Sequence, residues 1–123
     1  MKLTPSKILV VYKFIGEITE CPLPYKAARR INKLKKQICN EFETILKAES
    51  DLVRSYGGVA AKGSYTFPDQ TSADEFRDRY KSFMEEEDDF DIEVVDLSKC
   101  IDMINISSNA IDALGGLVYF GEE

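Results

Sequence analysis

One apolar pattern with helical spacing runs from about residue 24 to residue 56, and it constrains this chain more than any other feature. The apolar side chains recur every three or four residues and share one helical face. They are Ile31, Leu34, Ile38, Phe42, Ile45, Ala48, Leu52 and Tyr56. A helix of this length spans about 50 Å, whereas a compact domain of this size has a diameter of about 35 Å. We therefore expect the helix to extend beyond the body of the protein, to bend, or to pack against a partner.

A shorter helix is expected before the long one, at about residues 4–19. Thr4 followed by Pro5 is typical of a helix start, because proline suits the first helical position. Two prolines at residues 22–24 separate the helices, since proline does not fit a helix interior. We expect residues 4–19 and 24–56 to form an antiparallel hairpin, with the shorter helix covering the first half of the longer one.

The second half of the chain predicts two further helices. Ser72, with Glu75 three residues later, has the spacing of a capping box and predicts a helix over residues 72–86. A short capped helix is expected from Ser107 to about residue 114, before a pair of glycines.

The strand candidates are few and short. Residues 64–67 and 92–95 are expected to pair as an antiparallel ribbon that lies on the helices, and residues 59–62 are expected to be a loop. A strand is the alternative for residues 8–12, which are rich in β-forming side chains, but the helical spacing that continues beyond them favours a helix.

These elements predict an α+β fold that is mainly α, in one domain over residues 1–123. It consists of an antiparallel helical hairpin with one long helix, a further helix, a short two-stranded antiparallel ribbon and a short C-terminal helix. The expected core residues are Ile8, Val11, Ile15, Ile31, Leu34, Ile38, Phe42, Ile45, Leu52, Phe76, Tyr80, Phe83, Val94 and Leu114.

The composition argues against catalysis and against a membrane. There is no histidine, the commonest general base and the commonest metal ligand. Three cysteines, an odd number with no Cys-x-x-Cys spacing, favour reduced thiols in a reducing compartment. No apolar run reaches the roughly 18 residues of a membrane span, and the glycines match no nucleotide-binding motif. We expect a cytoplasmic protein with no catalytic residue, no cofactor and no metal.

A basic segment, residues 26–36, contains six cations and no acid: Lys26, Arg29, Arg30, Lys33, Lys35 and Lys36. Helical spacing aligns Arg29, Lys33 and Lys36 on one face, which would suit contacts with nucleic-acid phosphates. The net charge of −6 and the lack of interleaved aromatic residues apart from Tyr25 argue against this use. The alternative is a solvated face that is complementary to the acidic residues elsewhere.

An acidic run, residues 85–91, is interrupted only by Phe90. It lacks the glycine that a calcium-binding EF-hand loop needs. It is therefore either a solvated loop, a partner of the basic segment, or a mimic of nucleic-acid phosphates that binds a basic groove through Glu86, Asp88 and Asp89.

The order of these parts is distinctive. A Leu-Pro break at residues 23–24 leads into a long charged helix that closes on Tyr56-Gly57, followed by a Gly-Ser-Tyr turn at residues 63–65, a Phe-containing helix, an Ile-Glu-Val segment and a short apolar helix. This order resembles a family of small uncharacterised proteins encoded by tailed bacteriophages and prophages. The resemblance implies a phage-encoded protein, in the bacterial cytoplasm or in a virion, and it brings no catalytic residue.

We predict a non-catalytic phage-type protein that acts through protein–protein contacts, as a homo-oligomer or with a protein partner, in a structural or assembly role. The candidate partner-binding residues are Ile31, Ile38, Ile45 and Leu52 of the apolar stripe, Arg29, Arg30, Lys33 and Lys36 of the basic segment, and Glu86, Asp88 and Asp89 of the acidic run. The alternatives are an acidic inhibitor of a host nucleic-acid-binding defence protein and nucleic-acid binding through the basic helix.

Overall fold

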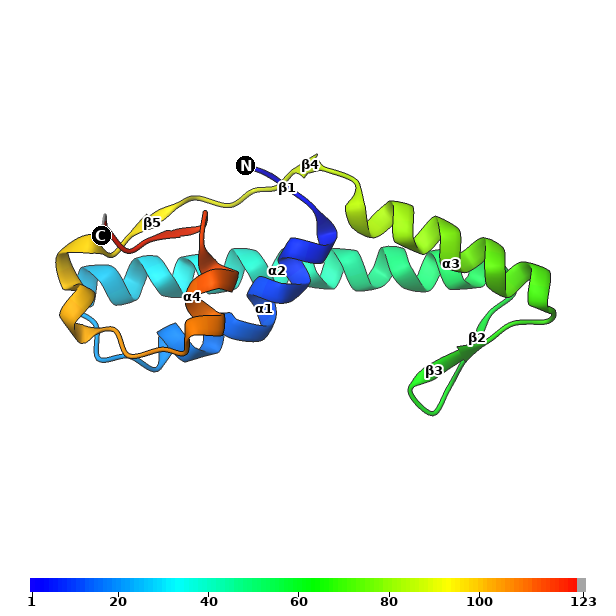
Figure 1. The fold of residues 1–123 in the computed structure, drawn as a ribbon, viewed down its shortest axis with the longest axis horizontal. Helices are drawn as coiled ribbons and strands as arrows, with labels where there is room; N and C mark the ends of the chain where they lie inside the picture. The colour runs from blue at the N-terminus through cyan, green and yellow to red at the C-terminus, as the bar shows by residue number, and fades with distance from the viewer. Residues whose placement is uncertain (122–123) are drawn as a thin grey trace.

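The computed structural model describes residues 1–121 (Figure 1); residues 122 and 123, which the expected domain includes, lie outside this range. Over residues 1–121 the element order is β1 (Lys2–Leu3), α1 (Pro5–Thr19), α2 (Tyr25–Ser55), β2 (Val59–Ala61), β3 (Ser64–Thr66), α3 (Gln70–Glu85), β4 (Asp88–Asp89), β5 (Val95–Asp96), the 3-10 helix η1 (Ser98–Met103), α4 (Ser108–Leu114) and β6 (Val118–Tyr119). The predicted fold class, α+β and mainly α, is confirmed.

Helix α2 is one unbroken rod of 31 residues that runs the length of the molecule (Figure 1). It contains neither glycine nor proline, so nothing in it favours a kink. It ends where Gly57 adopts a positive φ of 72° and the N–H of Gly58 donates to the carbonyl of Val53 at 2.9 Å. Such a left-handed glycine is the usual helix stop, and the predicted single long helix is confirmed.

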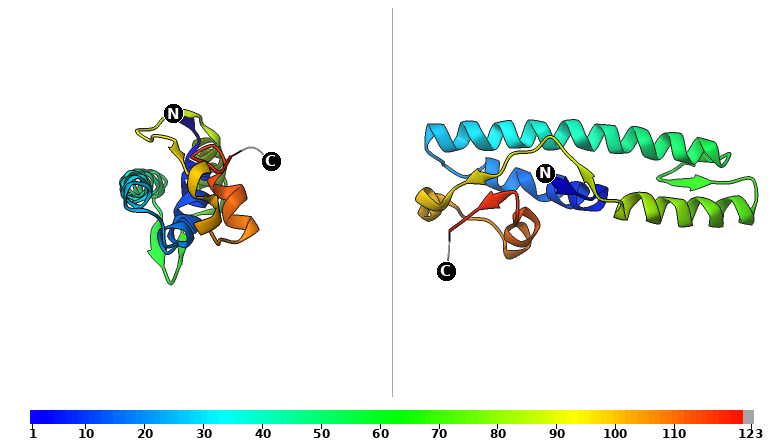
Figure 2. Two further views of the ribbon diagram at one scale, coloured as in Figure 1. Left: turned by 90° about the vertical axis from the view of Figure 1, so that its left-hand side faces the viewer. Right: turned by 90° about the horizontal axis from the view of Figure 1, so that it is seen from above.

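Helices α1 and α3 lie along successive halves of α2, one after the other (Figure 2). Thr4 caps α1, because its hydroxyl accepts the N–H of Lys7 at 3.2 Å, and Pro5 occupies the first turn. The antiparallel hairpin of α1 and α2 is as predicted. Helix α1 begins near the middle of α2, so α1 covers the first half of α2 and α3 covers the second half.

The first half of the molecule has a dense aliphatic core. We call this part the body: α1, residues 25–45 of α2, and residues 92–121. Its most completely buried side chains are Ile8, Val11, Ile15, Ile18, Ile31, Leu34, Ile38, Leu97, Leu114 and Leu117. Short strands β5 and β6 pair in parallel over this core, with the N–H of Val95 donating to the carbonyl of Leu117 at 2.9 Å.

Helix α4 closes the body against α1. Its predicted cap is confirmed, since the Ser107 hydroxyl accepts the N–H of Ala110 at 3.1 Å. At the other end of α4, the Lys7 ammonium of α1 donates to the carbonyl of Ala113 at 2.6 Å. A cation at a helix C-terminus is favourable because it faces the negative end of the helix dipole.

The second half of the molecule, residues 46–85, is a narrow extension that we call the arm. It contains the end of α2, the β2–β3 hairpin and α3. Helix α3 starts two residues earlier than predicted, because its cap is Asp69 rather than Ser72: the Asp69 carboxylate accepts the N–H of Ser72 at 2.7 Å. The predicted capping box is therefore wrong, and Glu75 lies inside the helix.

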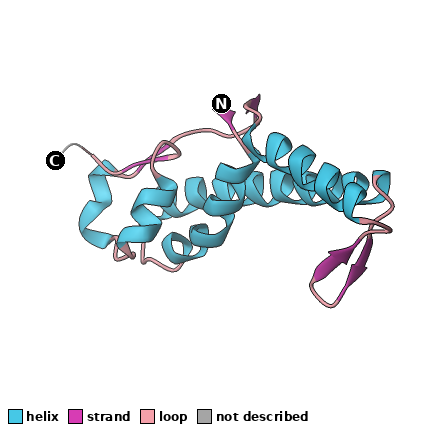
Figure 3. Ribbon diagram, turned by 45° about the vertical axis from the view of Figure 1, so that its right-hand side comes forward, coloured by secondary structure: helices cyan, strands magenta, loops and turns pink. Residues whose placement is uncertain are grey.

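The predicted strand pairing is also wrong. Strand β3 pairs with β2, a segment expected to be a loop, and not with residues 92–95. A two-residue turn joins them, with positive φ at Lys62 and Gly63, and the hairpin projects away from the helices (Figure 3). A local turn closes a far shorter loop than the predicted pairing requires, so its entropy cost is lower.

The predicted core needs correction in the segment that crosses the body. Val94 was expected inside but is 55% exposed, whereas Ile92 and Val95 are buried. Only Val95 and Asp96 of this segment form a strand, so the strict alternation of a longer strand does not apply. Five other expected core residues are only half-buried: Phe42, Leu52, Phe76, Tyr80 and Phe83.

Candidate interaction surfaces

The apolar stripe of α2 is mostly covered by the chain itself. Ile31, Ile38 and Ile45 are between 0 and 5% exposed and belong to the core of the body. Leu52 lies in the arm and is half-buried. Of the four stripe residues predicted to bind a partner, the first three therefore cannot reach one while the protein keeps this fold.

The basic segment remains on the surface, and all six of its cations are exposed. Over residues 1–121 its one ion pair is the contact at 3.4 Å between the Lys33 ammonium and the Glu93 carboxylate. Exposed pairs of this kind contribute less than about 1 kcal/mol. The segment therefore keeps almost all of its charge available for another molecule.

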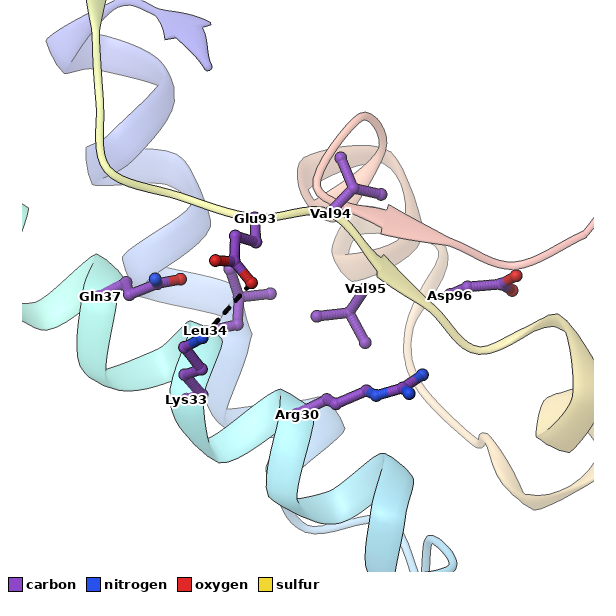
Figure 4. Close-up of a pocket in the computed structure, with 8 residues that line it drawn as sticks. All are labelled: Arg30, Lys33, Leu34, Gln37, Glu93, Val94, Val95 and Asp96. Carbon is purple, nitrogen blue, oxygen red and sulfur yellow. Dashed lines mark hydrogen bonds and ion pairs between the residues drawn. The ribbon is translucent and has the colours of Figure 1, made fainter.

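A shallow opening of about 380 Å³ lies beside the basic segment, between α2 and β5 (Figure 4). Arg30 and Lys33 line one side, and Glu93 and Asp96 line the other. Hydrogen bonds from the backbone and hydroxyl of Ser98 hold the pKa of Asp96 below its ordinary value, and the charges of Lys99 and Arg30 add to this effect. Two cations thus face two carboxylates, and the opening has no net preference for an anion.

The acidic run lies beside the middle of α2, away from the basic segment. Glu86, Asp88 and Asp89 sit near Glu41, Thr44 and Ala48 around a small surface opening. Within residues 1–121 no residue of the run pairs with a cation of the basic segment. The interpretation that the acidic run neutralises the basic segment is therefore wrong.

One carboxylate of the run has a structural partner. The amino group of Met1 donates to Asp89 at 2.7 Å and to the carbonyl of Phe90 at 2.9 Å. This hydrogen bond, with the charge of the amino group, lowers the pKa of Asp89 below its ordinary value. Glu86 and Asp88 are exposed and form no ion pair with any described residue.

Aromatic contacts hold the arm together. Phe76 of α3 is the centre of the cluster, and its ring centroid lies 4.9 to 6.4 Å from those of Tyr56, Tyr65, Phe67 and Tyr80. Helix α3 has no buried residue, and Val53, at 4% exposed, is the one buried hydrophobic residue of the arm. The arm therefore presents partly exposed aromatic side chains over most of its length.

Glu49 of α2 sits beside two tyrosines of this cluster. The Tyr65 hydroxyl donates to the Glu49 carboxylate at 3.4 Å. Burial raises the pKa of Tyr80 to about 12, and a hydrogen bond to Glu49 together with its negative charge adds to the increase. The pKa of Tyr65 is raised by the same causes, with burial the largest. Both hydroxyls therefore stay protonated as donors.

A second apolar surface lies at the junction of body and arm, and we call it the midface: Tyr12, Phe42 and Leu46. The rings of Tyr12 and Phe42 stack almost parallel, with their centroids 3.8 Å apart. Leu46 follows Phe42 by one helical turn. Tyr12 is 41% exposed and Leu46 is 42% exposed, so water covers part of an apolar patch in the middle of the molecule.

The sequence predicts the midface only in part. Tyr12 falls on the apolar face expected for the helix at residues 4–19, and Phe42 is an expected core residue, but Leu46 lies beside the apolar stripe of α2 and was not expected in an apolar patch. The signal was the apolar pair Phe42 and Leu46 at a spacing of four, which widens the stripe of α2 at this point.

The end of the body carries an apolar groove of about 470 Å³. Its apolar lining comes from η1, α4 and the segments next to them: Ile101, Ile104, Ile106, Ile111 and Phe120. Ile101 and Ile111 are both partly exposed. This groove is a further apolar surface, at the opposite end of the molecule from the arm.

Over residues 1–121 no cluster of three or more cysteine, aspartate or glutamate side chains is arranged to hold a metal ion. No helix in the same range is both long and apolar enough to cross a bilayer.

No known protein family, no curated protein and no solved structure matches this chain. The resemblance to small phage proteins therefore stays a prediction, and the function has to be argued from the surfaces themselves.

Proposed function

We propose that this protein is a non-catalytic interaction protein that binds another protein chain through the arm and the midface. The observation that carries the proposal is that α3, a helix of 16 residues, has no buried residue. A helix that short gains most of its stability from packing an apolar face. The aromatic face of α3 is half-covered by α2, and a partner would complete the cover.

The chemistry of the surface suits a protein partner. Tyrosine and phenylalanine are enriched in protein interfaces, because each buries a large area at a small cost in side-chain entropy. The arm offers Tyr65 and Tyr80, and the midface adds Tyr12 and Leu46. Burial of their remaining apolar area would contribute about 25 cal/mol per Å².

A structural or assembly role follows from this reading, and the resemblance to small phage proteins is consistent with it. In that setting the protein would act in the bacterial cytoplasm or in a virion. The two charged alternatives are weaker. Residues 37–91 carry fourteen acids and six cations, an excess that repels nucleic acid. The phosphate-mimic alternative rests on Glu86, Asp88 and Asp89, which are exposed acids, and ion pairs at an exposed surface contribute less than about 1 kcal/mol each.

The test is a quantitative capture experiment from the native host, with binding compared between matched variants. Leu46→Glu places a charge in the midface and is expected to weaken capture of a specific partner by at least about tenfold, the effect of roughly 1.4 kcal/mol. Ile111→Glu changes an equally exposed residue in the end groove and should leave capture unchanged. Capture that is insensitive to Leu46→Glu, or that is lost only with Ile111→Glu, would contradict the proposal.

A further inference from the structure

We infer that the partner is a second copy of this chain, packed antiparallel against the first about a two-fold axis that passes beside Cys39 of α2. This inference rests on the proposed function, because it uses the same midface, and it names the partner. Three observations support it: the separation of charge along the rod, the position of the midface, and a self-complementary pair of charges.

The charges of the molecule are separated along its length. The basic segment holds six cations and no acid, whereas residues 37–91 hold fourteen acids and six cations. The unbroken α2 keeps these regions apart: the basic segment occupies its first third, and the acidic run lies beside its middle (Figure 1). Over residues 1–121 the two are not neutralised within the chain. With the axis beside Cys39, residues 26–36 of one copy would lie beside residues 42–52 of the other α2, which carry three acids and one cation, whereas a parallel copy would place the two basic segments together. The acidic run lies beside Glu41 and Ala48, on the opposite face of α2, and contributes only to the long-range attraction.

The midface lies where a two-fold axis needs an apolar patch. In a symmetric dimer the same patch meets itself, so it must sit near the axis. Cys39 is one residue from the midpoint of α2, and Phe42 is only about 4.5 Å beyond Cys39 along the helix, at about 1.5 Å per residue. The Tyr12 and Phe42 rings of the two copies would therefore lie on either side of the axis and cover each other.

One ridge of α2 carries a charge pattern that is complementary to itself. Lys35, Cys39 and Glu43 are spaced four residues apart and so lie on one helical face. Lys35 and Glu43 are exposed, and neither forms an ion pair with any residue in the range 1–121. Because they are equidistant from Cys39, an antiparallel copy centred there brings Lys35 of each chain to Glu43 of the other, twice per dimer. Helix ridges at this spacing are also the rows that interdigitate when helices pack.

The test exchanges these charges and measures the dissociation constant of the dimer by sedimentation equilibrium at low salt. Lys35→Glu and Glu43→Lys, made singly, each turn two attractive contacts into two repulsive ones. Each is expected to weaken the dimer by about tenfold or more, since each contact is worth up to about 1 kcal/mol. The double variant Lys35→Glu/Glu43→Lys restores both contacts and is expected to return to near the wild-type value. An equal mixture of the two single variants should form a mixed dimer for the same reason.

Lys99→Glu is the control, because it changes the net charge by the same magnitude at an exposed residue of η1, which is not part of the ridge formed by Lys35, Cys39 and Glu43. It should leave the dissociation constant unchanged, and circular dichroism of every variant checks that the helices remain. All of these exchanges lie at the surface, so loss of folding does not compete with loss of the dimer.

Three outcomes would overturn the inference. The first is a wild-type chain that stays monomeric up to about 1 mM, where any remaining association is worth only about 4 kcal/mol. The second is a dimer whose dissociation constant is unchanged by both single exchanges, and the third is a double variant whose dissociation constant stays as high as those of the single variants. The proposed function would survive the first outcome if Leu46→Glu still abolished capture of a different host protein. Failure of both experiments would remove both proposals.

Discussion

The body and the arm are built on the same helix but are held together in different ways. In the body, α2 packs against α1, α4 and the β5–β6 pair through aliphatic side chains, and residues such as Ile8 and Ile38 have no exposed surface at all. In the arm, α2 meets only α3 and the hairpin, and Val53 is the one buried hydrophobic residue. The comparison shows that a continuous helix does not imply a continuous core.

The difference has a simple origin in the residues that face α2. The body supplies isoleucine, valine and leucine from several directions, so small side chains fill the space and exclude water. Helix α3 supplies one aromatic residue per turn: Phe76, Tyr80 and Phe83. All three side chains are only half-buried, so water reaches part of each ring. The arm is therefore the part of the molecule that gains most from a neighbour.

The largest expected effect separates the two regions directly. Ile38→Ala in the body should lower the free energy of unfolding by about 2–5 kcal/mol, because it leaves a cavity in a closely packed core. Leu52→Ala, two helical repeats further along the same stripe, should cost less than half as much, because Leu52 already touches water. Urea denaturation followed by circular dichroism measures both. Equal losses would show that the arm has a core as complete as that of the body.

A second substitution tests a tightly packed point of the arm. A Cβ atom at Gly58 would lie 2.6 Å from Cγ1 of Val53 and 2.7 Å from the Phe67 ring, so Gly58→Ala forces Val53 to move. We expect a loss of about 1–3 kcal/mol in the stability of the protein, the usual cost of overpacking. Thermal unfolding measures it. The matched change in the body, Gly16→Ala, meets open space within α1 and should stabilise the helix by up to about 1 kcal/mol. A neutral result at Gly58 would mean that the arm is loose even there.

The smallest expected effect is a pH dependence confined to the arm. The pKa of Tyr80 is about 12 in the folded protein, compared with the ordinary tyrosine value of 10.0 that applies to the unfolded chain. Between pH 10 and 12 the unfolded chain has therefore lost a proton that the folded chain keeps, so folding becomes less favourable as the pH rises, and the full contribution is present only below pH 10. Tyr80→Phe should flatten the fall in unfolding free energy across this window, as measured by urea denaturation at each pH. A Tyr80 that titrates near pH 10 by tyrosinate absorbance would show that the cluster is open to water.

Local signals in the sequence were enough to predict the four α-helices, but not the 3-10 helix η1. Thr4 with Pro5, Ser107, and Gly57 act through hydrogen bonds or dihedral angles within a few residues of themselves, and each one marks an observed helix end. Asp69 and Ser72 show the limit of such signals. Both are good caps, three residues apart, and the choice between them depends on where the chain leaves the hairpin.

The strand pairs and the surfaces depend on distant contacts, which the sequence pattern does not encode in a readable form. Residues 95 and 118 pair only because α4 turns the chain back over the core. The burial of Ile31, Ile38 and Ile45 likewise depends on α1 and on segments more than fifty residues further along. An apolar stripe has the same pattern whether the chain itself or a partner covers it. The stripe alone therefore does not show whether it is buried inside the protein or in an interface.

The absence of glycine and proline from α2 has a mechanical consequence. A helix of 31 residues that cannot hinge holds its two ends at a fixed separation of about 46 Å and in a fixed rotation about its axis. A molecule that binds the end of α2 next to the β2–β3 hairpin therefore also fixes the direction in which Arg29 and Lys36 point at the other end. The protein is therefore a rigid spacer, and the number of residues between Pro24 and Gly57 sets its length.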